Sequence, residues 1–106
     1  MPLTRSFKDT VQARVNRDPE YRNALFQEAV ETLLEGDVET SKTILRDYIN
    51  ATVGFKELSE ATGIPSTSLM RMFGPSGNPN LRNMFTVIKE LQEATNLYLR
   101  VEVVGR

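Results

Sequence analysis

Residues 55–73 of the chain read FKELSEATGIPSTSLMRMF, and they predict two short helices joined by the tight turn Thr62-Gly63-Ile64. Two helices that cross at a steep angle need a small side chain in the first helix and a turn residue that tolerates a positive φ. Ser59 and Gly63 occupy those two places. The apolar positions at which the helices would pack on each other and on the core are Leu58, Ile64, Leu69 and Met72. The segment therefore predicts a helix-turn-helix.

Apolar side chains before this segment recur at helical spacing. They predict a first helix over residues 5–16. A second helix is expected to begin at the cap Asp18-Pro19 and to end at Gly36, and a third to begin at the cap Asp37 and to end at Gly54. The residues expected to face inward on these helices are Phe7, Val11 and Val15; Tyr21, Leu25, Ala29, Leu33 and Leu34; and Val38, Leu45, Tyr48 and Ile49.

After the segment, Asn78-Pro79 repeats the pattern of a cap followed by proline and is expected to open another helix. The residues expected to face inward on it are Leu81, Met84, Phe85, Ile88 and Leu91. The chain then changes period, because residues 97–104, LYLRVEVV, alternate as a strand does. The residues on one face of that strand are Leu97, Leu99, Val101 and Val103.

No second strand is evident, and an isolated strand leaves its backbone groups unpaired. We therefore expect the C-terminal strand to pair between two copies of the chain in a two-fold homodimer. The alternative is pairing with an irregular segment of the same chain near residues 50–55.

With 106 residues, 40% hydrophobic and 25% charged, the chain is expected to form one mainly α domain of five to six helices plus the C-terminal strand. Its parts are the N-terminal helices at 1–53, the helix-turn-helix core at 54–95 and the strand at 96–106. No apolar run approaches the roughly 20 residues that span a bilayer, and the N-terminus lacks the apolar run of a signal peptide. We expect a cytoplasmic protein with no membrane partner.

The chain contains no cysteine and no histidine, which excludes disulfides and every catalytic scheme or metal site that depends on those residues. Glu57 and Glu60 lie three apart on one predicted helix, but a solvated helix face explains them better than paired acid-base catalysis. We expect no enzyme, no cofactor, no metal and no small-molecule substrate.

Charge is unevenly distributed along the chain, whose net charge is −1. Residues 1–60 hold 8 basic and 11 acidic side chains, whereas residues 61–89 hold Arg71, Arg82 and Lys89 and no carboxylate. A surface that faces phosphates must avoid like charge, so the second region is the one suited to nucleic acid.

The second helix of the predicted motif carries the candidate base-reading residues, because its N-terminal part enters the major groove in helix-turn-helix proteins. With Leu69 and Met72 turned inward, the base-reading candidates are Ser66, Thr67, Met70 and Arg71. The phosphate-binding candidates are Lys56, Ser68, Asn78, Asn80 and Arg82. Double-stranded operator DNA is the expected partner.

Residues 55–91 resemble the helix-turn-helix domain of the HigA-type addiction-module antidote proteins, a lambda-repressor-like family. The matching places are Leu58-Ser59, Gly63-Ile64, Ser66 to Phe73 and Gly77-Asn78-Pro79, preceded by Glu35-Gly36-Asp37, so that the similarity spans about residues 20–103. The resemblance implies a dimeric antitoxin that represses its own operon in a type II toxin-antitoxin module and binds a toxin, typically a small ribonuclease. The chain departs from the family at Pro65, where Ser or Thr usually caps the second helix, and in its longer tail.

The alternative is a protein-interaction module that keeps the helix-turn-helix fold without binding DNA, which the low basicity favours. The two differ in the surface around Lys56, Arg71 and Arg82. If DNA is the ligand, that surface should be positive and free of the acidic residues Glu28, Glu31 and Glu35.

Overall fold

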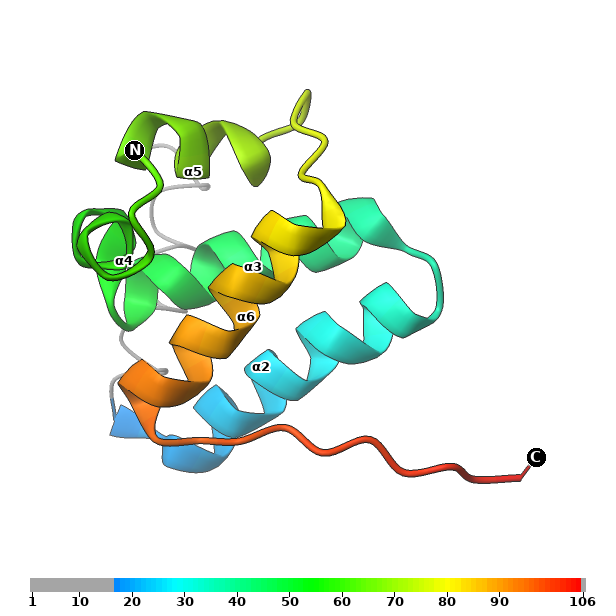
Figure 1. The fold of residues 1–106 in the computed structure, drawn as a ribbon. Helices are drawn as coiled ribbons and strands as arrows, with labels where there is room; N and C mark the ends of the chain where they lie inside the picture. Colours follow the sequence, from blue (N-terminus) through cyan, green and yellow to red (C-terminus); the bar gives the residue numbers. More distant parts are fainter. Residues whose placement is uncertain (1–16, 106) are drawn as a thin grey trace, which may run out of the picture.

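The computed structural model describes residues 17–105, so the helix predicted over 5–16 lies outside the described residues. Five helices follow one another in that part: α2 (Pro19–Leu34), α3 (Val38–Ala51), α4 (Gly54–Thr62), α5 (Ser66–Met72) and α6 (Leu81–Thr95). In Figure 1, α2 and α3 form a hairpin, α6 lies beside them, and α5 lies on the far side of α3 and α6 from α2. None of these five helices is long and apolar enough to cross a bilayer. The described chain is mainly helical and compact, as predicted.

The starts of α2 and α3 are where their caps were predicted. The Asp18 carboxylate accepts hydrogen bonds from two backbone N–H groups in the first turn of α2, at 3.1 and 3.2 Å. The Asp37 carboxylate accepts one from the N–H of Thr40 at 3.1 Å. Hydrogen bonding by the Thr40 side chain, and then by its backbone, lowers the pKa of Asp37. Gly36, between the helices, has a φ of 88°, in the left-handed region that favours glycine. The hairpin is therefore set by local sequence.

Two predicted boundaries are wrong. The residue that caps α6 is Asn80 and not Asn78, because the Asn80 side-chain oxygen accepts the N–H three residues on at 2.7 Å and the helix begins at Leu81. The third helix ends at Ala51, and Gly54, with a φ of 80°, opens α4 instead of closing α3.

The core lies between the hairpin, α4, α5 and α6. Its buried apolar residues are Phe26, Ala29, Leu45, Tyr48, Ile49, Phe55, Leu58, Leu69, Met72, Phe73, Met84, Val87, Ile88 and Leu91. Phe26, which the spacing did not predict, stacks on Tyr48 with ring centroids 4.7 Å apart. The residues wrongly predicted to face inward are Leu34, Val38, Leu81 and Phe85, which are 68%, 40%, 74% and 55% exposed. The first three are the first or last residues of their helices.

The hydroxyl of Tyr48 is buried, and by distance and angle it makes no hydrogen bond within residues 17–105. Burial raises the pKa of this hydroxyl above its ordinary value, and the nearby Thr95 and Arg22 lower it by less. Because the folded state favours the neutral phenol, the contribution of Tyr48 to stability is complete below about pH 10. It is lost as the pH rises through the raised pKa.

We predict that the free energy of unfolding, measured in urea, falls between about pH 8 and pH 11, and that it falls less in the Tyr48→Phe variant. An equal loss in both proteins would contradict this assignment.

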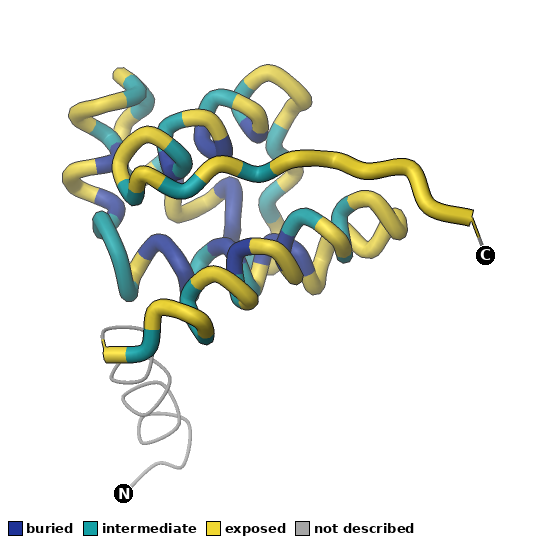
Figure 2. The backbone as a smooth tube through the Cα atoms, turned by 90° about the horizontal axis from the view of Figure 1, so that it is seen from below, coloured by how far each residue is buried: buried dark blue, intermediate teal, exposed yellow. Residues whose placement is uncertain are grey.

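Residues 97–105 form neither helix nor strand in the described chain, so the predicted C-terminal strand is not present within one molecule. The suggested partner segment, residues 50–55, belongs to α3, α4 and the turn between them. The tail leaves the end of α6 as an extended trace and is exposed beyond Leu99, as Figure 2 shows.

Candidate nucleic-acid interface

The turn between α4 and α5 is fixed by two hydroxyl side chains. Gly63 takes the left-handed conformation there with a φ of 78°. The Ser59 hydroxyl donates a hydrogen bond to the carbonyl of Ile64 at 2.6 Å. The Thr62 hydroxyl accepts one from the N–H of Ile64 at 3.2 Å and donates one to the carbonyl of Leu58 at 2.8 Å. Ser59 is thus more than a small residue, because its hydroxyl ties the first helix to the start of the second.

The packing of α5 leaves one of its faces free. Leu69 and Met72 are buried, as predicted, and Leu58 on α4 is buried with them. The base-reading candidates Thr67, Met70 and Arg71 are exposed, and Ser66 is half-buried. Pro65 precedes the helix in an extended conformation, with ψ at 141°, so that α5 begins at Ser66 without a side-chain cap.

A groove of about 370 Å³ lies beside this face, between α5 and the start of α6. Its lining residues are Ile64, Ser68, Arg71, Met72, Ser76, Gly77, Asn78 and Asn83. Three of them, Ser68, Arg71 and Asn78, were candidates from the sequence. The lining offers one cation, hydroxyls and amides but no carboxylate, a set of groups that suits an anionic ligand.

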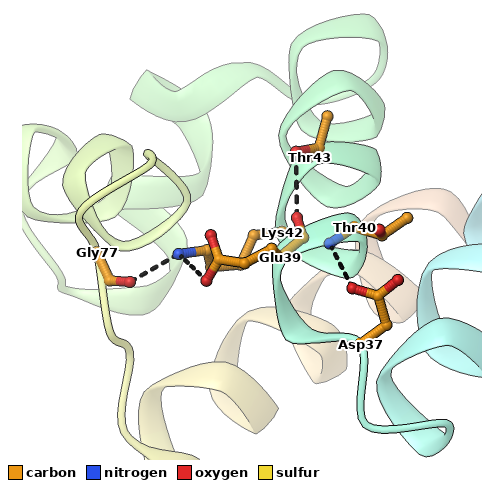
Figure 3. Close-up of polar contacts among 6 residues, drawn as sticks. All are labelled: Asp37, Glu39, Thr40, Lys42, Thr43 and Gly77. Carbon is orange, nitrogen blue, oxygen red and sulfur yellow. Dashed lines mark hydrogen bonds and ion pairs between the residues drawn. The ribbon is translucent and has the colours of Figure 1, made fainter.

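Lys42 on α3 anchors the loop that forms one wall of the groove (Figure 3). Its ammonium group donates to the carbonyl of Gly77 at 2.7 Å and lies 3.1 Å from the carboxylate of Glu39. The Lys42 side chain is only 2% exposed, whereas that of Glu39 is 71% exposed. The ion pair is therefore at the surface, and the bond to the loop carbonyl is the protected contact.

Gly77 is also packed against the end of α5. A Cβ built on it would overlap the carbonyl oxygen of Arg71 and lie 2.6 Å from that of Met72. Only glycine permits this close approach, which sets where the loop leaves α5. Lys42 and Gly77 together hold the groove in place.

The remaining phosphate-binding candidates do not line the groove. Asn80 caps α6, Arg82 follows in its first turn, and Lys56 lies near the start of α4; all three are exposed. Among residues 17–105, the ion pairs join Lys42 to Glu39 and Lys89 to Glu93, so that Lys56, Arg71 and Arg82 form none there. Their charges are available to an outside partner.

The three acidic residues expected to be absent from a DNA-facing surface lie away from α5. Glu28 and Glu31 are on α2 and Glu35 follows it, and Figure 1 places α3 and α6 between that helix and α5. Glu57 and Glu60, the carboxylates considered for catalysis, are exposed on α4. Within residues 17–105 no group of three or more acidic side chains is placed to hold a metal ion.

Sequence reasoning missed four residues of this region: Lys42, Ser76, Gly77 as a packing residue, and Asn83. A signal existed for Lys42, which stands three residues before Leu45 and seven before Ile49 and so shares their buried stripe. The other three could not be found by spacing, because the fold of the loop brings them to α5.

Comparison of the chain with profiles of known protein families, with characterised proteins and with solved structures found no match.

Proposed function

We propose that the chain is a sequence-specific DNA-binding transcriptional regulator in which α4, the Gly63 turn and α5 act as a helix-turn-helix. The observation that carries the proposal is the position of Arg71. Its side chain is exposed on α5, forms no ion pair within residues 17–105 and lines a groove without carboxylates. A cation left uncompensated in such surroundings is suited to an anionic partner of extended shape.

The exposed face of α5 offers the groups that read base edges. The Arg71 guanidinium can bond the O6 and N7 atoms of guanine together, and the Thr67 and Ser66 hydroxyls can donate or accept at several bases. Met70, 49% exposed, offers an apolar contact for a thymine methyl. We assign phosphate contacts to Lys56, Ser68, Asn78, Asn80 and Arg82, which position the protein without reading sequence.

The antitoxin part of the proposal rests on the resemblance to the HigA-type proteins. We propose that the chain represses its own operon and binds a toxin encoded beside it. The genes on either side of this one test the antitoxin part separately. If neither encodes a small toxin-like protein, the chain would be a DNA-binding regulator without a toxin partner.

Salt dependence of binding tests the electrostatic half of the proposal. We predict that Lys56→Ala and Arg82→Ala each weaken binding to specific and scrambled DNA alike. Each should also lower the slope of log K against log salt by about 1, because each removes one phosphate contact. Arg17→Ala is the matched control, since Arg17 is exposed just before α2, the helix on the far side from α5. A wild-type affinity that does not change with salt would overturn the proposal.

The second candidate, a protein-interaction module, is favoured by the exposure of Leu81 and Phe85, two large apolar side chains one turn apart on α6. If the folded protein binds no DNA, the protein-interaction module becomes the favoured function. Replacing both residues with serine would then abolish partner binding while leaving the groove beside α5 unchanged.

A further inference from the structure

Within residues 17–105, the tail after α6 has one backbone edge hydrogen-bonded to α6 and one edge without such bonds. The N–H of Leu97 donates to the backbone carbonyl of Gln92 at 3.2 Å, and the N–H of Leu99 donates to the side-chain oxygen of the same residue at 2.8 Å. In an extended chain the N–H and C=O groups of alternate residues point to opposite edges. The edge that carries residues 97 and 99 thus faces α6, and the edge that carries residues 98, 100, 102 and 104 faces away.

The side chains of the tail alternate as well. Leu97 and Leu99 are half-buried and Leu99 packs on the core, whereas Tyr98 and Arg100 are exposed. The same alternation places Val101 and Val103 on the face that Leu97 and Leu99 use, but there they are 73% and 96% exposed. Figure 2 shows the tail continuing past the helices as an exposed trace. Within the described residues, Val101 and Val103 therefore extend the inward face without being covered.

Pairing of this free edge with a copy of itself is possible in only a few registers. A two-fold axis at residue 100 would set Arg100 against the partner's Arg100, and an axis at residue 102 would set Glu102 against the partner's Glu102. Like charges directly opposite each other destabilise a strand pair. An axis at Val101 sets Arg100 opposite the partner's Glu102 on both sides, and it pairs the whole of residues 97–105.

We propose that two copies of the chain pair antiparallel through residues 97–105, with the two-fold axis at Val101. In this register Arg100 exchanges backbone hydrogen bonds with the partner's Glu102. These bonds form along the edge of the tail that is not bonded to Gln92. Val101 faces the partner's Val101 at a pair without backbone hydrogen bonds, where side chains come closest. Val103 lies beside the partner's Leu99, so that the uncovered apolar face of each tail extends the core of the other copy.

The contact between two copies does not depend on DNA binding. A two-stranded ribbon alone is marginal in water, so the contact gains its stability from the apolar face that packs on the helices. Its failure is measured without DNA and is therefore distinct from failure of the proposed function.

Disulfide trapping tests the register, because the chain has no cysteine of its own. We expect Val101→Cys to form a disulfide-linked dimer on mild oxidation with glutathione. Val103→Cys is the matched control, because Val103 is also an exposed valine on the same face. In the proposed register it lies four residues, roughly 13 Å of strand, from the partner's Val103. A mixture of Leu99→Cys and Val103→Cys chains should cross-link to each other. Cross-linking of Val103→Cys alone as fast as Val101→Cys would overturn the register.

Charge reversal tests the same contact in solution without cysteine chemistry. Arg100→Glu and Glu102→Arg should each shift the protein from dimer to monomer in light scattering at tens of micromolar, since each sets like charges opposite each other. The double variant Arg100→Glu/Glu102→Arg should restore the dimer. A wild-type monomer at that concentration, or a dimer that persists when residues 100–105 are removed, would overturn the proposal.

Discussion

Gly77→Ala is expected to lower the free energy of unfolding by about 3 kcal/mol, at the upper end of what overpacking costs. The added methyl group would overlap the carbonyl oxygens of Arg71 and Met72, and these are backbone atoms that cannot turn aside. The loop must therefore leave α5, and the groove beside Arg71 opens. Thermal and urea unfolding followed by circular dichroism measure the effect.

Gly74→Ala is the matched control, from the same loop. A Cβ at Gly74 would lie 3.4 and 3.5 Å from the carbonyl oxygens of Met70 and Arg71, which is ordinary contact. We expect this change to stay within about 0.5 kcal/mol of the wild type. Equal stability of the Gly77→Ala and Gly74→Ala proteins would show that the close approach of Gly77 to α5 is not a feature of the molecule.

Lys42→Met is expected to cost roughly 2–3 kcal/mol of unfolding free energy. Methionine keeps most of the apolar stem, but the Gly77 carbonyl loses a charged donor at 2.7 Å in a partly buried place. Because the loop then loses its hydrogen bond to α3, affinity for DNA should fall along with stability. The measurement is urea unfolding of the variant beside the wild type.

Two variants separate the loop anchor from the ion pair. Glu39→Gln removes the carboxylate that pairs with Lys42, and Lys89→Met removes a lysine from the exposed pair with Glu93. Both pairs have an exposed partner, so each change should cost less than about 1 kcal/mol. If Glu39→Gln costs as much as Lys42→Met, the ion pair and not the bond to Gly77 stabilises the protein.

Local sequence signals predicted the features of the fold that depend on few residues. Asp18 and Asp37 cap their helices because a carboxylate at that position bonds backbone N–H groups whatever the rest of the chain does. Gly63 was correctly placed in the turn, since few other residues take a positive φ at low cost. Leu58, Leu69 and Met72 were correctly predicted to be buried because the turn fixes which sides of α4 and α5 meet.

Helix ends were the main source of error in the predicted core. Leu34 is the last residue of α2, Val38 the first of α3 and Leu81 the first of α6. Each continues the apolar spacing of its helix, but spacing does not reveal where the neighbouring helix stops. Phe85 lies at the edge of the stripe formed by Met84, Val87, Ile88 and Leu91 and for that reason stays exposed.

The groove depends on contacts between segments far apart in the sequence. Lys42 and Gly77 are 35 residues apart, and neither alone indicates a loop anchor. The cap of α6 is Asn80, three residues after Gly77, and the spacing of the sequence did not distinguish it from Asn78. The tail is a related case, because the alternation of its side chains is visible in the sequence but its partner is not.

Binding to DNA from just upstream of the protein's own gene, compared with scrambled DNA of equal length at about 150 mM salt, tests the central claim most directly. The wild type should prefer its own upstream DNA. Arg71→Ala should lose about 1–3 kcal/mol of that preference, as expected for an arginine that bonds a guanine, while Arg17→Ala keeps it. If the folded wild-type protein binds neither DNA, or if Arg71→Ala keeps the full preference, α5 is not a base-reading helix.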